Sequence, residues 1–412
     1  MERTIFLIDM NAYFASVEQS INPSLRGKPI VVCGEGRTVV TTASYEARKL
    51  GVKTGMSLPE AKKACPQLVP VYGDMNKYVH TTHRIHKILL EYTDLLEAFS
   101  IDESFIDVSH LCKKKDDAKN IAREIKRKIK EKLGLLCSIG IGPNKAVAKI
   151  ASKMQKPDGL VEIRKEDIPD VFENLSLEKL QGIGIGKKVS EKLKSLGIKT
   201  AKDLGNAPLS LLVHHFGIIG NYLKNIGQGN DNTPLKKYFE YEQAKSIGHS
   251  RTLLKNTRDI NVIKSYLMML SEKVGSRLRA SSLEGNTINF FLRYGDFTHF
   301  AMQHNLKNAI RDSSDIYRHA NALFQKALPL QKPARMLGVS ISRLSPQNGQ
   351  TYFFDDYYKK IKFTETLDSI NKLYGPFTIK PSSVLIAEKF GIKEGCGMVA
   401  KSRKKFSFSD DI

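Results

Sequence analysis

The chain has 412 residues, room for about two to four domains, and its 65 lysine and arginine residues against 43 acidic ones give a formal net charge of +22. Such an excess of positive charge predicts an acidic partner, either nucleic acid or an anionic membrane surface. No apolar run approaches the length of a membrane span and the N-terminus has no signal-peptide pattern, so we expect a cytoplasmic protein that binds nucleic acid and no membrane. The cysteines lack C-x-x-C spacing and are expected to be buried thiols, not disulfides or zinc ligands: Cys33, Cys65, Cys112, Cys137 and Cys396.

Three carboxylates lie at the ends of short apolar runs. The run Thr4–Ile8 predicts a buried strand and is followed directly by Asp9, while 97–101 and 104–108 predict two strands with Asp102 and Glu103 at the turn between them. Taken singly, each acid is typical of an ordinary turn or cap. If the strands are neighbours in one sheet, however, three like charges meet at one edge and require compensation. Such an oxygen cluster predicts Mg²⁺, with Mn²⁺ as a substitute, and two ions about 4 Å apart suit in-line attack on a phosphate.

The elements around these carboxylates predict one α/β unit made of residues 1–10 and 78–165. Apolar residues at four-residue spacing predict a helix over Asp117–Leu133, followed by a strand at 137–141 and a helix at 144–154. This order fits an antiparallel or mixed sheet backed by helices, of the ferredoxin-like type. The insertion at 11–77 is expected to be a small α/β piece, with strands at 29–33 and 38–42 and a helix from Ser44.

Residues 166–230 are expected to be helical and contain a glycine-rich turn. Glycine-x-glycine between two short helices exposes backbone N–H groups to a phosphate, as in a helix-hairpin-helix that grips DNA without reading its sequence. A dinucleotide-binding fold is the rival, but no apolar strand precedes this turn. The residues expected to bind DNA here are Gly182, Gly184, Gly186 and Lys187.

A polar linker at 231–244 separates these helices from a predicted βαββαβ domain at 245–344. That domain holds sixteen lysine and arginine residues against six acidic ones, which favours a surface for a nucleic-acid backbone over ordinary solvated helix faces. Arg251 and Arg343 are candidate contacts. Residues 345–412 are expected to be a short tail with one apolar cluster, Gln350–Phe354, and a basic end from Lys401.

Four segments of the sequence resemble motifs of a known protein family. Ile8–Glu18 (IDMNAYFASVE), Val39–Arg48 (VVTTASYEAR), Ser100–Ser104 (SIDES) and Lys153–Pro157 (KMQKP) together resemble the Y family of DNA polymerases, the translesion enzymes. The resemblance implies an α+β multidomain fold, a right hand with a ferredoxin-like palm (1–10 and 78–165), small fingers (11–77), a helical thumb with the helix-hairpin-helix (166–230) and a βαββαβ little-finger domain (245–344).

The same resemblance implies roles for single residues. Asp9, Asp102 and Glu103 would be the catalytic metal ligands, with the Met10 carbonyl adding one. Thr42, Tyr45, Arg48 and Lys156 would hold the incoming triphosphate, and Phe14 would be the steric gate whose ring collides with a 2′-hydroxyl.

Two departures help to place the chain within the family. Asn11 stands where the DinB-like branch usually has a second aspartate, and so looks more UmuC-like. The motif Gln350–Phe354 is similar to the sliding-clamp-binding peptide placed internally, as in UmuC-like proteins, with Gln350, Phe353 and Phe354 as its clamp contacts, although it lacks the usual leucines.

The resemblance implies template-directed, low-fidelity DNA synthesis by two-metal nucleotidyl transfer, with roles in DNA repair and the SOS response. Its partners would be primer-template DNA, dNTP and the sliding clamp; the sequence leaves open an accessory subunit or a recombinase filament. A catalytically weak UmuC-like subunit or DNA-binding scaffold is the alternative. A nucleotidyl cyclase could use the same palm but would need no thumb or basic domain.

Overall fold

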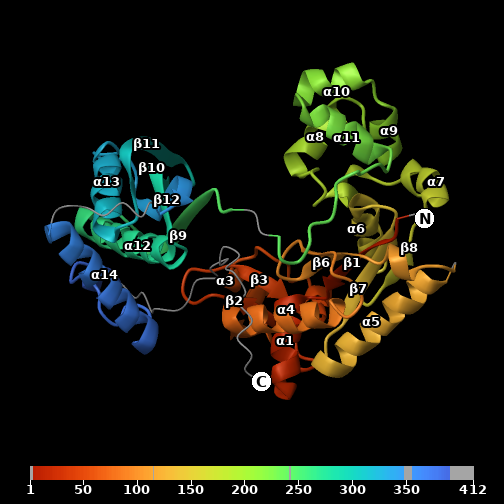
Figure 1. The fold of residues 1–412 in the computed structure, drawn as a ribbon, viewed down its shortest axis with the longest axis horizontal. Helices are drawn as coiled ribbons and strands as arrows, with labels where there is room; N and C mark the ends of the chain where they lie inside the picture. The colour runs from red at the N-terminus through yellow and green to blue at the C-terminus, as the bar shows by residue number, and fades with distance from the viewer. Residues whose placement is uncertain (1–2, 115, 241–242, 348–354, 390–412) are drawn as a thin grey trace. The chain divides into compact units, whose positions relative to one another are not determined.

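The computed structural model describes residues 3–114, 116–240, 243–347 and 355–389, which form two compact units (Figure 1). The first comprises Met1–Cys33 and Thr38–Tyr241, and the second comprises Gly34–Arg37 and Glu242–Ile412.

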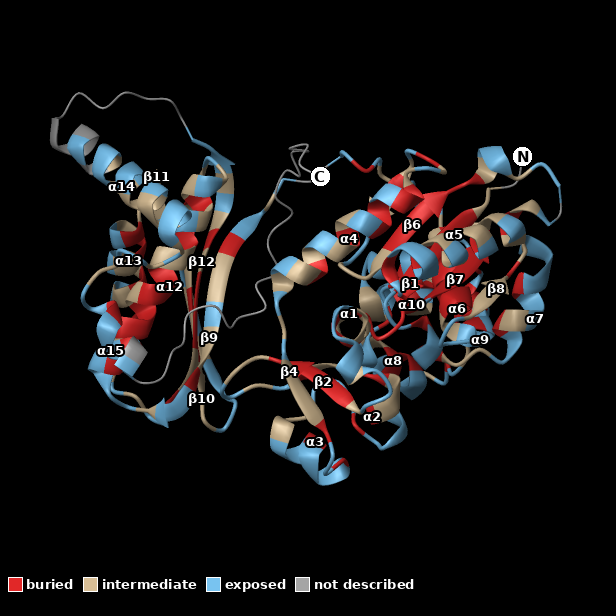
Figure 2. Ribbon diagram, turned by 90° about the horizontal axis from the view of Figure 1, so that it is seen from below, coloured by how far each residue is buried: buried red, intermediate tan, exposed pale blue. Residues whose placement is uncertain are grey.

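A five-stranded sheet with β1 at its centre is the frame of the first unit. In spatial order its strands are β5 (Leu96–Ala98), β6 (Glu103–Asp107), β1 (Ile5–Met10), β7 (Cys137–Gly142) and β8 (Leu160–Glu162). Strand β1 pairs antiparallel with both neighbours and is buried along its whole length (Figure 2), as expected for a strand covered on both faces. The alternation is clear: Phe6 and Ile8 join one core cluster, and Ile5 and Leu7 join another.

Helices cover both faces of this sheet. The core with Phe6 and Ile8 is closed by α1 (Tyr13–Ile21), α4 (Met75–Leu89) and α5 (Asp117–Leu133), while α6 (Lys145–Met154) supplies Ala148 to the other side. The predicted α+β fold with a ferredoxin-like sheet is confirmed, and helix 117–133 has the predicted limits. Short 3-10 turns lie at Pro23–Leu25, Ser109–Leu111 and Lys165–Asp167.

The first strand differs from the prediction. It runs on to Met10, so Asp9 lies inside β1 and not after it, because β6 and β7 still offer backbone partners at that position. Helices α1 and α4 were not predicted. In α4 the sequence MNKYVHTTHRIHKIL mixes histidine and threonine into the buried side, which hides the apolar stripe.

The expected insertion contains its own three-stranded sheet. Its order is β3 (Val40–Ala43), β2 (Ile30–Cys33) and β4 (Val69–Tyr72), with helices α2 (Tyr45–Lys49) and α3 (Leu58–Ala64). Ser44 caps α2 by accepting a hydrogen bond from the Ala47 N–H, which confirms the predicted helix start. Strand β4 was missed because Pro70 demotes a short run as a strand.

The stretch after β8 is helical, as predicted. It contains α7 (Ile168–Glu173), a 3-10 turn (Leu177–Leu180), α8 (Lys187–Ser195), α9 (Ala201–Asn206), α10 (Leu209–Phe216) and α11 (Ile219–Gly227). Their core includes Val147 and Ile150 of α6, so this helix packs both on these helices and on the five-stranded sheet.

The second unit has the predicted βαββαβ order. Its sheet runs β11 (His299–Ile310), β10 (Leu283–Tyr294), β12 (Ala334–Pro346) and β9 (Ser246–Thr257), and α12 (Ile260–Ala280) and α13 (Ser313–Gln325) pack on it. All the sheet pairings are antiparallel.

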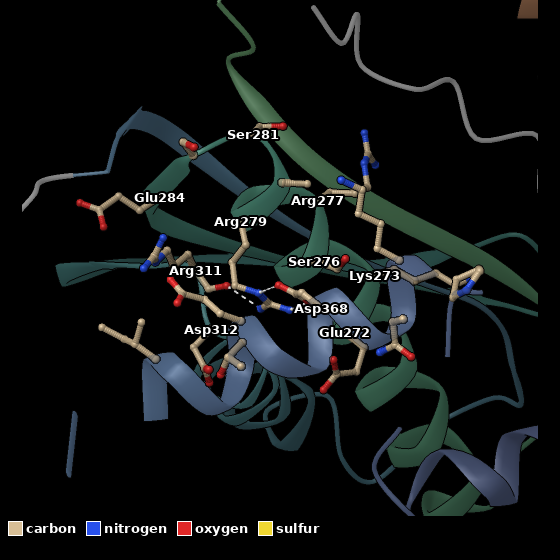
Figure 3. Close-up of a pocket in the computed structure, with 18 of the residues that line it drawn as sticks. Glu272, Lys273, Ser276, Arg277, Arg279, Ser281, Glu284, Arg311, Asp312 and Asp368 are labelled. Atoms are coloured by element: carbon tan, nitrogen blue, oxygen red, sulfur yellow. Dashed lines mark hydrogen bonds and ion pairs between the residues drawn. The ribbon is translucent and has the colours of Figure 1, made fainter. Parts of the chain in front are cut away.

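Two further helices, not predicted from the sequence, extend this unit. They are α14 (Asp355–Tyr374) and α15 (Val384–Lys389). Arg279 of α12 donates to Asp368 of α14 through two nitrogens, at 2.6 and 2.9 Å, beside a cavity of about 880 Å³ (Figure 3). Helix α15 buries Val384 and Ala387 against α12, and the Ala387 N–H donates to the Ser265 hydroxyl at 2.8 Å.

None of the described cysteines forms a disulfide bond; Cys33, Cys65 and Cys137 are buried, as predicted, whereas Cys112 is only partly buried.

Candidate active site

The three predicted carboxylates lie on adjacent strands. In the β1–β6 ladder Asp9 lies directly opposite Glu103, and directly opposed residues project to the same face of a sheet. The Met10 N–H donates to the carbonyl of Asp102 at 2.9 Å, so the turn between β5 and β6 is hydrogen-bonded to β1. The backbone therefore gathers these acids at one place, as the sequence predicts.

Ser100 shapes the turn that carries two of the acids. Its hydroxyl donates to Asp102 Oδ1 at 2.6 Å and accepts from the Glu103 N–H at 3.0 Å. The Ser100 N–H in turn donates to the Glu103 carbonyl at 3.1 Å. A serine bonding to a backbone N–H three residues on is an ordinary turn device, here placed beside the carboxylates.

Two lysines neutralise the other two acids. Lys156 forms an ion pair with Asp9, and Lys149 Nζ lies 2.9 Å from Glu103 Oε2 with only 5% of its side chain exposed. The Lys149 ammonium also lies over the Phe99 ring, 4.1 Å from its centroid. Burial raises the pKa of Asp9 to about 6; the positive charge of Lys156 opposes this, and the nearby Glu103 and Asp102 add to it.

Among the described residues, no group of three His, Cys, Asp or Glu side chains is arranged to hold a metal ion. Asp9 and Glu103 are paired with lysines, and Asp102 accepts a hydrogen bond from Ser100. The donor set nevertheless suits a hard divalent cation. Asp9, Asp102 and Glu103 offer carboxylate oxygens on one sheet edge, and a bound cation would stabilise the charged form of Asp9, whose pKa is raised mainly by burial.

Three of the four predicted triphosphate residues, Thr42, Tyr45 and Arg48, lie on β3 and α2 of the neighbouring small sheet, whereas Lys156 follows α6. Arg48 Nε donates to the Ala43 carbonyl at 2.9 Å, and its guanidinium lies over the Tyr45 ring at 4.9 Å from the centroid. Burial raises the pKa of the Tyr45 phenol, and the charge of Asp9 raises it further, so this ring lies within electrostatic reach of Asp9. Thr42 is half-buried on β3, opposite Val32.

Phe14 lies in the first turn of α1, which begins directly after Ala12, a residue with a left-handed backbone conformation (φ 44°). Its ring stacks on Tyr78 of α4, with centroids 4.3 Å apart and planes inclined by 25°. The ring is half-buried, so one side packs on the core while part of it stays accessible.

Asn11, between β1 and α1, is buried. Its side-chain oxygen accepts a hydrogen bond from Ser138 at 3.0 Å, whereas its amide nitrogen has no hydrogen-bond partner among the described residues. Ser138 itself lies opposite Asp9 in the β1–β7 ladder.

The glycine-rich turn lies beside α6. Gly182 and Gly184 have φ values of 89° and 93°, which favour glycine, and Gly186 precedes α8 with an ordinary φ. A Cβ atom on Gly182 would lie 2.9 Å from Lys149 Cε, so this glycine also makes room for the lysine that holds Glu103. Lys187 is 85% exposed.

The DNA-binding candidates of the second unit occupy different settings. Arg251 is half-buried near Tyr266 of α12, on the helix-covered side that also holds Ile247 and Leu253, while Arg343 is exposed with φ 53°. The predicted clamp-binding residues Gln350, Phe353 and Phe354 lie outside the described residues.

Sequence reasoning missed the lysines of α6. Lys145, Lys149 and Lys153 recur every four residues, a signal for one helix face that was not connected with the carboxylates. Lys145 pairs with Glu97 at 3.0 Å, Lys149 with Glu103, and Lys153 donates to the Gln181 carbonyl.

The structure resembles solved polymerase structures. It matches the "Y-family DNA polymerase chimera Dbh-Dpo4(243-245)-Dbh" with a TM-score of 0.75 and 29% identity, over 84% of this chain and 100% of that one. It also matches the "Dbh Ternary Complex (substrates partially disordered)" with a TM-score of 0.56 and 30% identity, over 82% of this chain and 98% of that one. The fold is therefore that of a Y-family DNA polymerase.

Family models and curated relatives agree. The impB/mucB/samB family model matches residues 8–153, and the model of that family's C-terminal domain matches residues 244–352. The chain belongs to this family. It is 35% identical to DNA polymerase IV of Desulfatibacillum aliphaticivorans, over 93% of this chain and 97% of the relative, and 35% identical to DNA polymerase IV 1 of Bacillus subtilis (strain 168), over 94% of each.

These names bear on the branch within the family. The relatives are called DNA polymerase IV, the DinB-like enzymes, so the comparisons do not support the closer kinship with the UmuC-like branch that was predicted from Asn11 and from the internal motif Gln350–Phe354. One side chain at a buried position is a weaker marker than similarity along the whole chain. Within the described residues, no helix is both long and apolar enough to cross a membrane.

Proposed function

We propose that this Y-family DNA polymerase is a low-fidelity, translesion enzyme of the DNA polymerase IV type, which extends a primer by template-directed transfer of deoxynucleotides. The observation that carries this proposal is the Asp9–Glu103 pairing across β1 and β6, with Asp102 hydrogen-bonded through its carbonyl to Met10. Three acids on one sheet edge suit phosphoryl transfer and serve no evident purpose in a scaffold.

In this proposal Asp9, Asp102, Glu103 and the Met10 carbonyl hold two Mg²⁺ ions, or Mn²⁺ in their place. Bound there, the ions would lower the pKa of the primer 3′-hydroxyl and neutralise charge on the triphosphate. Lys156 would exchange Asp9 for the leaving pyrophosphate, since its ammonium already lies at the site. The ion pair between Lys149 and Glu103 would likewise open, which leaves the Glu103 carboxylate able to bind a metal ion.

The remaining side chains act on the nucleotide. Arg48 offers a guanidinium fork to phosphate oxygens, Tyr45 and Thr42 offer hydroxyl groups, and the accessible part of Phe14 excludes a 2′-hydroxyl from the sugar site. Each of these groups binds or orients. The bond made is between the 3′-oxygen and the α-phosphorus, and the bond broken releases pyrophosphate.

We assign DNA contacts to the hairpin Gly182–Lys187 and to the basic surface of residues 245–344, including Arg251 and Arg343. The domain limits proposed are those expected from the sequence: palm 1–10 and 78–165, fingers 11–77, thumb 166–230, linker 231–244 and little finger 245–344. A sliding clamp bound through Gln350, Phe353 and Phe354 belongs to the same proposal. We also infer a place in the cytoplasm.

The first test is primer extension with Mg²⁺ and dNTPs. The intact chain should extend a labelled primer on an undamaged template, and Asp102→Ala and Glu103→Ala should lose extension but keep DNA binding. Asp94→Ala is the matched control, since Asp94 is an exposed acid of the same unit. Tight DNA binding without extension by the intact chain would favour the alternative, a catalytically weak subunit or scaffold.

The lesion-bypass part needs its own test. The small insertion 11–77 has no long helix among its described elements to close over the new base pair, which leaves selection to base pairing. Extension should therefore continue opposite an abasic site or a bulky adduct. A stall at the lesion equal to that of a replicative polymerase would contradict this part alone.

A further inference from the structure

Helix α4 contacts the carboxylate-bearing turn at two points, one on each side of the acids. The Thr82 hydroxyl donates to the carbonyl of Ile101 at 2.6 Å, and His86 Nε2 lies 2.9 Å from the hydroxyl of Ser104. Residues four apart lie on one face of a helix, so both contacts come from the same side of α4. Together they bracket Asp102 and Glu103.

These contacts are buried. Thr82, His86 and Ser104 expose only 8%, 4% and 5% of their surface. Buried polar groups that lose their partner are costly, because no water replaces it. Tyr13 adds to the set, since its hydroxyl lies 2.7 Å from Thr82 Oγ1 and 2.8 Å from the carbonyl of Tyr78, which also lies 3.0 Å from the Thr82 hydroxyl.

The other ring nitrogen of His86 meets the segment 231–240, which we call the joining segment. Nδ1 lies 3.2 Å from the hydroxyl of Tyr238, and the two rings meet edge to face. A neutral imidazole donates from one nitrogen and accepts at the other, so two partners fix the ring's orientation. The joining segment is held elsewhere too, as the Lys236 N–H donates to Glu97 Oε2 at 3.1 Å.

The turn depends on such support. It joins β5, an edge strand of three residues, to β6. Glu103 and Ser104 pair with Asp9 and Ile8 of β1, and the Asp102 carbonyl accepts a hydrogen bond from the Met10 N–H. Helix α4 adds the contacts of Thr82 with Ile101 and of His86 with Ser104.

We propose that Thr82 and His86 are positioning residues, which hold the Ile101–Ser104 turn in the geometry that the proposed polymerase reaction needs, with Tyr238 orienting the His86 ring. Neither residue touches substrate. The proposal rests on the proposed function, because a displaced turn would move Asp102 and Glu103 relative to the reacting phosphate. Misplacement by about 1 Å can cost a factor of about 10² in rate.

The test compares Thr82→Val with Thr81→Val. Valine keeps the shape of threonine and removes the hydroxyl. The Thr81 hydroxyl donates to the Lys77 carbonyl of its own helix, away from the carboxylate-bearing turn. We expect Thr82→Val to lower kcat at least about tenfold, with KM for dNTP and Kd for primer-template within about twofold of the intact chain. Thr81→Val should match the intact chain, and Thr82→Ser should restore kcat.

The second arm separates the two sides of His86. Ser104→Ala should lower kcat as Thr82→Val does, and it removes so little volume that it keeps the test decisive if Thr82→Val fails to fold. Tyr238→Phe keeps the ring and removes only the hydroxyl, so a smaller loss of kcat is expected. His86→Gln retains a donor near Nε2 and should keep more activity than His86→Leu.

If Thr82→Val and Ser104→Ala lower the melting temperature but leave kcat unchanged, the proposal is overturned and the contacts are structural only. An intact chain without extension activity would instead contradict the proposed function. The two failures are therefore distinguishable.

Discussion

Phe14 packs one side of its ring on Tyr78 and leaves part of it accessible. Phe14→Ala would remove the group proposed to collide with a 2′-hydroxyl, so we expect ribonucleotide incorporation to rise at least about tenfold relative to deoxynucleotides. The measurement is kcat/KM for a matched rNTP and dNTP pair. Tyr72→Phe, at an exposed ring of the same unit, is the control, and unchanged sugar selection in Phe14→Ala would refute the gate.

His86 makes folding sensitive to acid. Burial lowers the pKa of His86 from 6.5 to about 4, and the nearby His83 adds to the effect. Between about pH 4 and pH 6.5, His86 therefore binds a proton in the unfolded chain but not in the folded one. The stability contribution is therefore complete above about pH 6.5 and is lost as the pH falls towards 4, by up to roughly 3 kcal/mol.

Urea unfolding between pH 4.5 and 7.5 checks this expectation. His86→Gln should remove much of the first unit's loss of stability with falling pH, while Asp9, whose pKa is raised to about 6, contributes a slope of opposite sign in both proteins. Some slope should remain in the second unit, because burial also lowers the pKa of His249 to about 4. An unchanged slope for the first unit in His86→Gln would show that His86 is not the responsible group.

The carboxylates could be found from the sequence because Asp9, Asp102 and Glu103 follow short β-rich runs whose pairing is easy to foresee. Lys149 could not, since its partner Glu103 is 46 residues away in sequence and only the fold brings them together. The setting of Arg251 also escaped prediction, because register alone decides which face of β9 a residue occupies.

At the scale of elements, the glycine-rich turn offers a controlled comparison. A Cβ on Gly184 would lie 2.7 Å from the Tyr222 ring at a φ of 93°, whereas Gly186 has an ordinary φ and open space around it. We expect Gly184→Ala to lower stability by about 1 to 3 kcal/mol and to weaken DNA binding, and Gly186→Ala to leave stability unchanged. Thermal unfolding and fluorescence-polarisation binding measure the two effects. Equal behaviour of the two variants would argue against a strained hairpin.

Elements with a clear apolar period were predicted well, as α5 shows, because its buried residues recur on one face. Helix α14 was not predicted. It contacts the rest of the second unit through the Arg279–Asp368 ion pair and half-buried residues. The helix therefore lacks the apolar stripe that predicts a helix from sequence.

For the whole molecule, a net charge of +22 predicts how binding responds to salt. Affinity for primer-template DNA should fall steeply, by roughly 10³-fold between 50 and 200 mM salt if about six phosphates are contacted, and should vary little with sequence. Lys187→Ala should reduce the slope of log K against log salt by about 1, because this lysine is highly exposed. A flat dependence would mean that the charge serves another partner.

The joining segment also decides where this polymerase can be divided. Leu235 packs against the cluster of Ile5, Leu7 and Phe105, and Tyr238 joins the core around Phe6 and Ile8. A graft made at residue 230 would carry both side chains away and leave apolar surface of the first unit bare, which invites aggregation. When the C-terminal domain is exchanged between relatives, residues 231–240 should therefore stay with the first unit. The junction between the two proteins should lie after Tyr238.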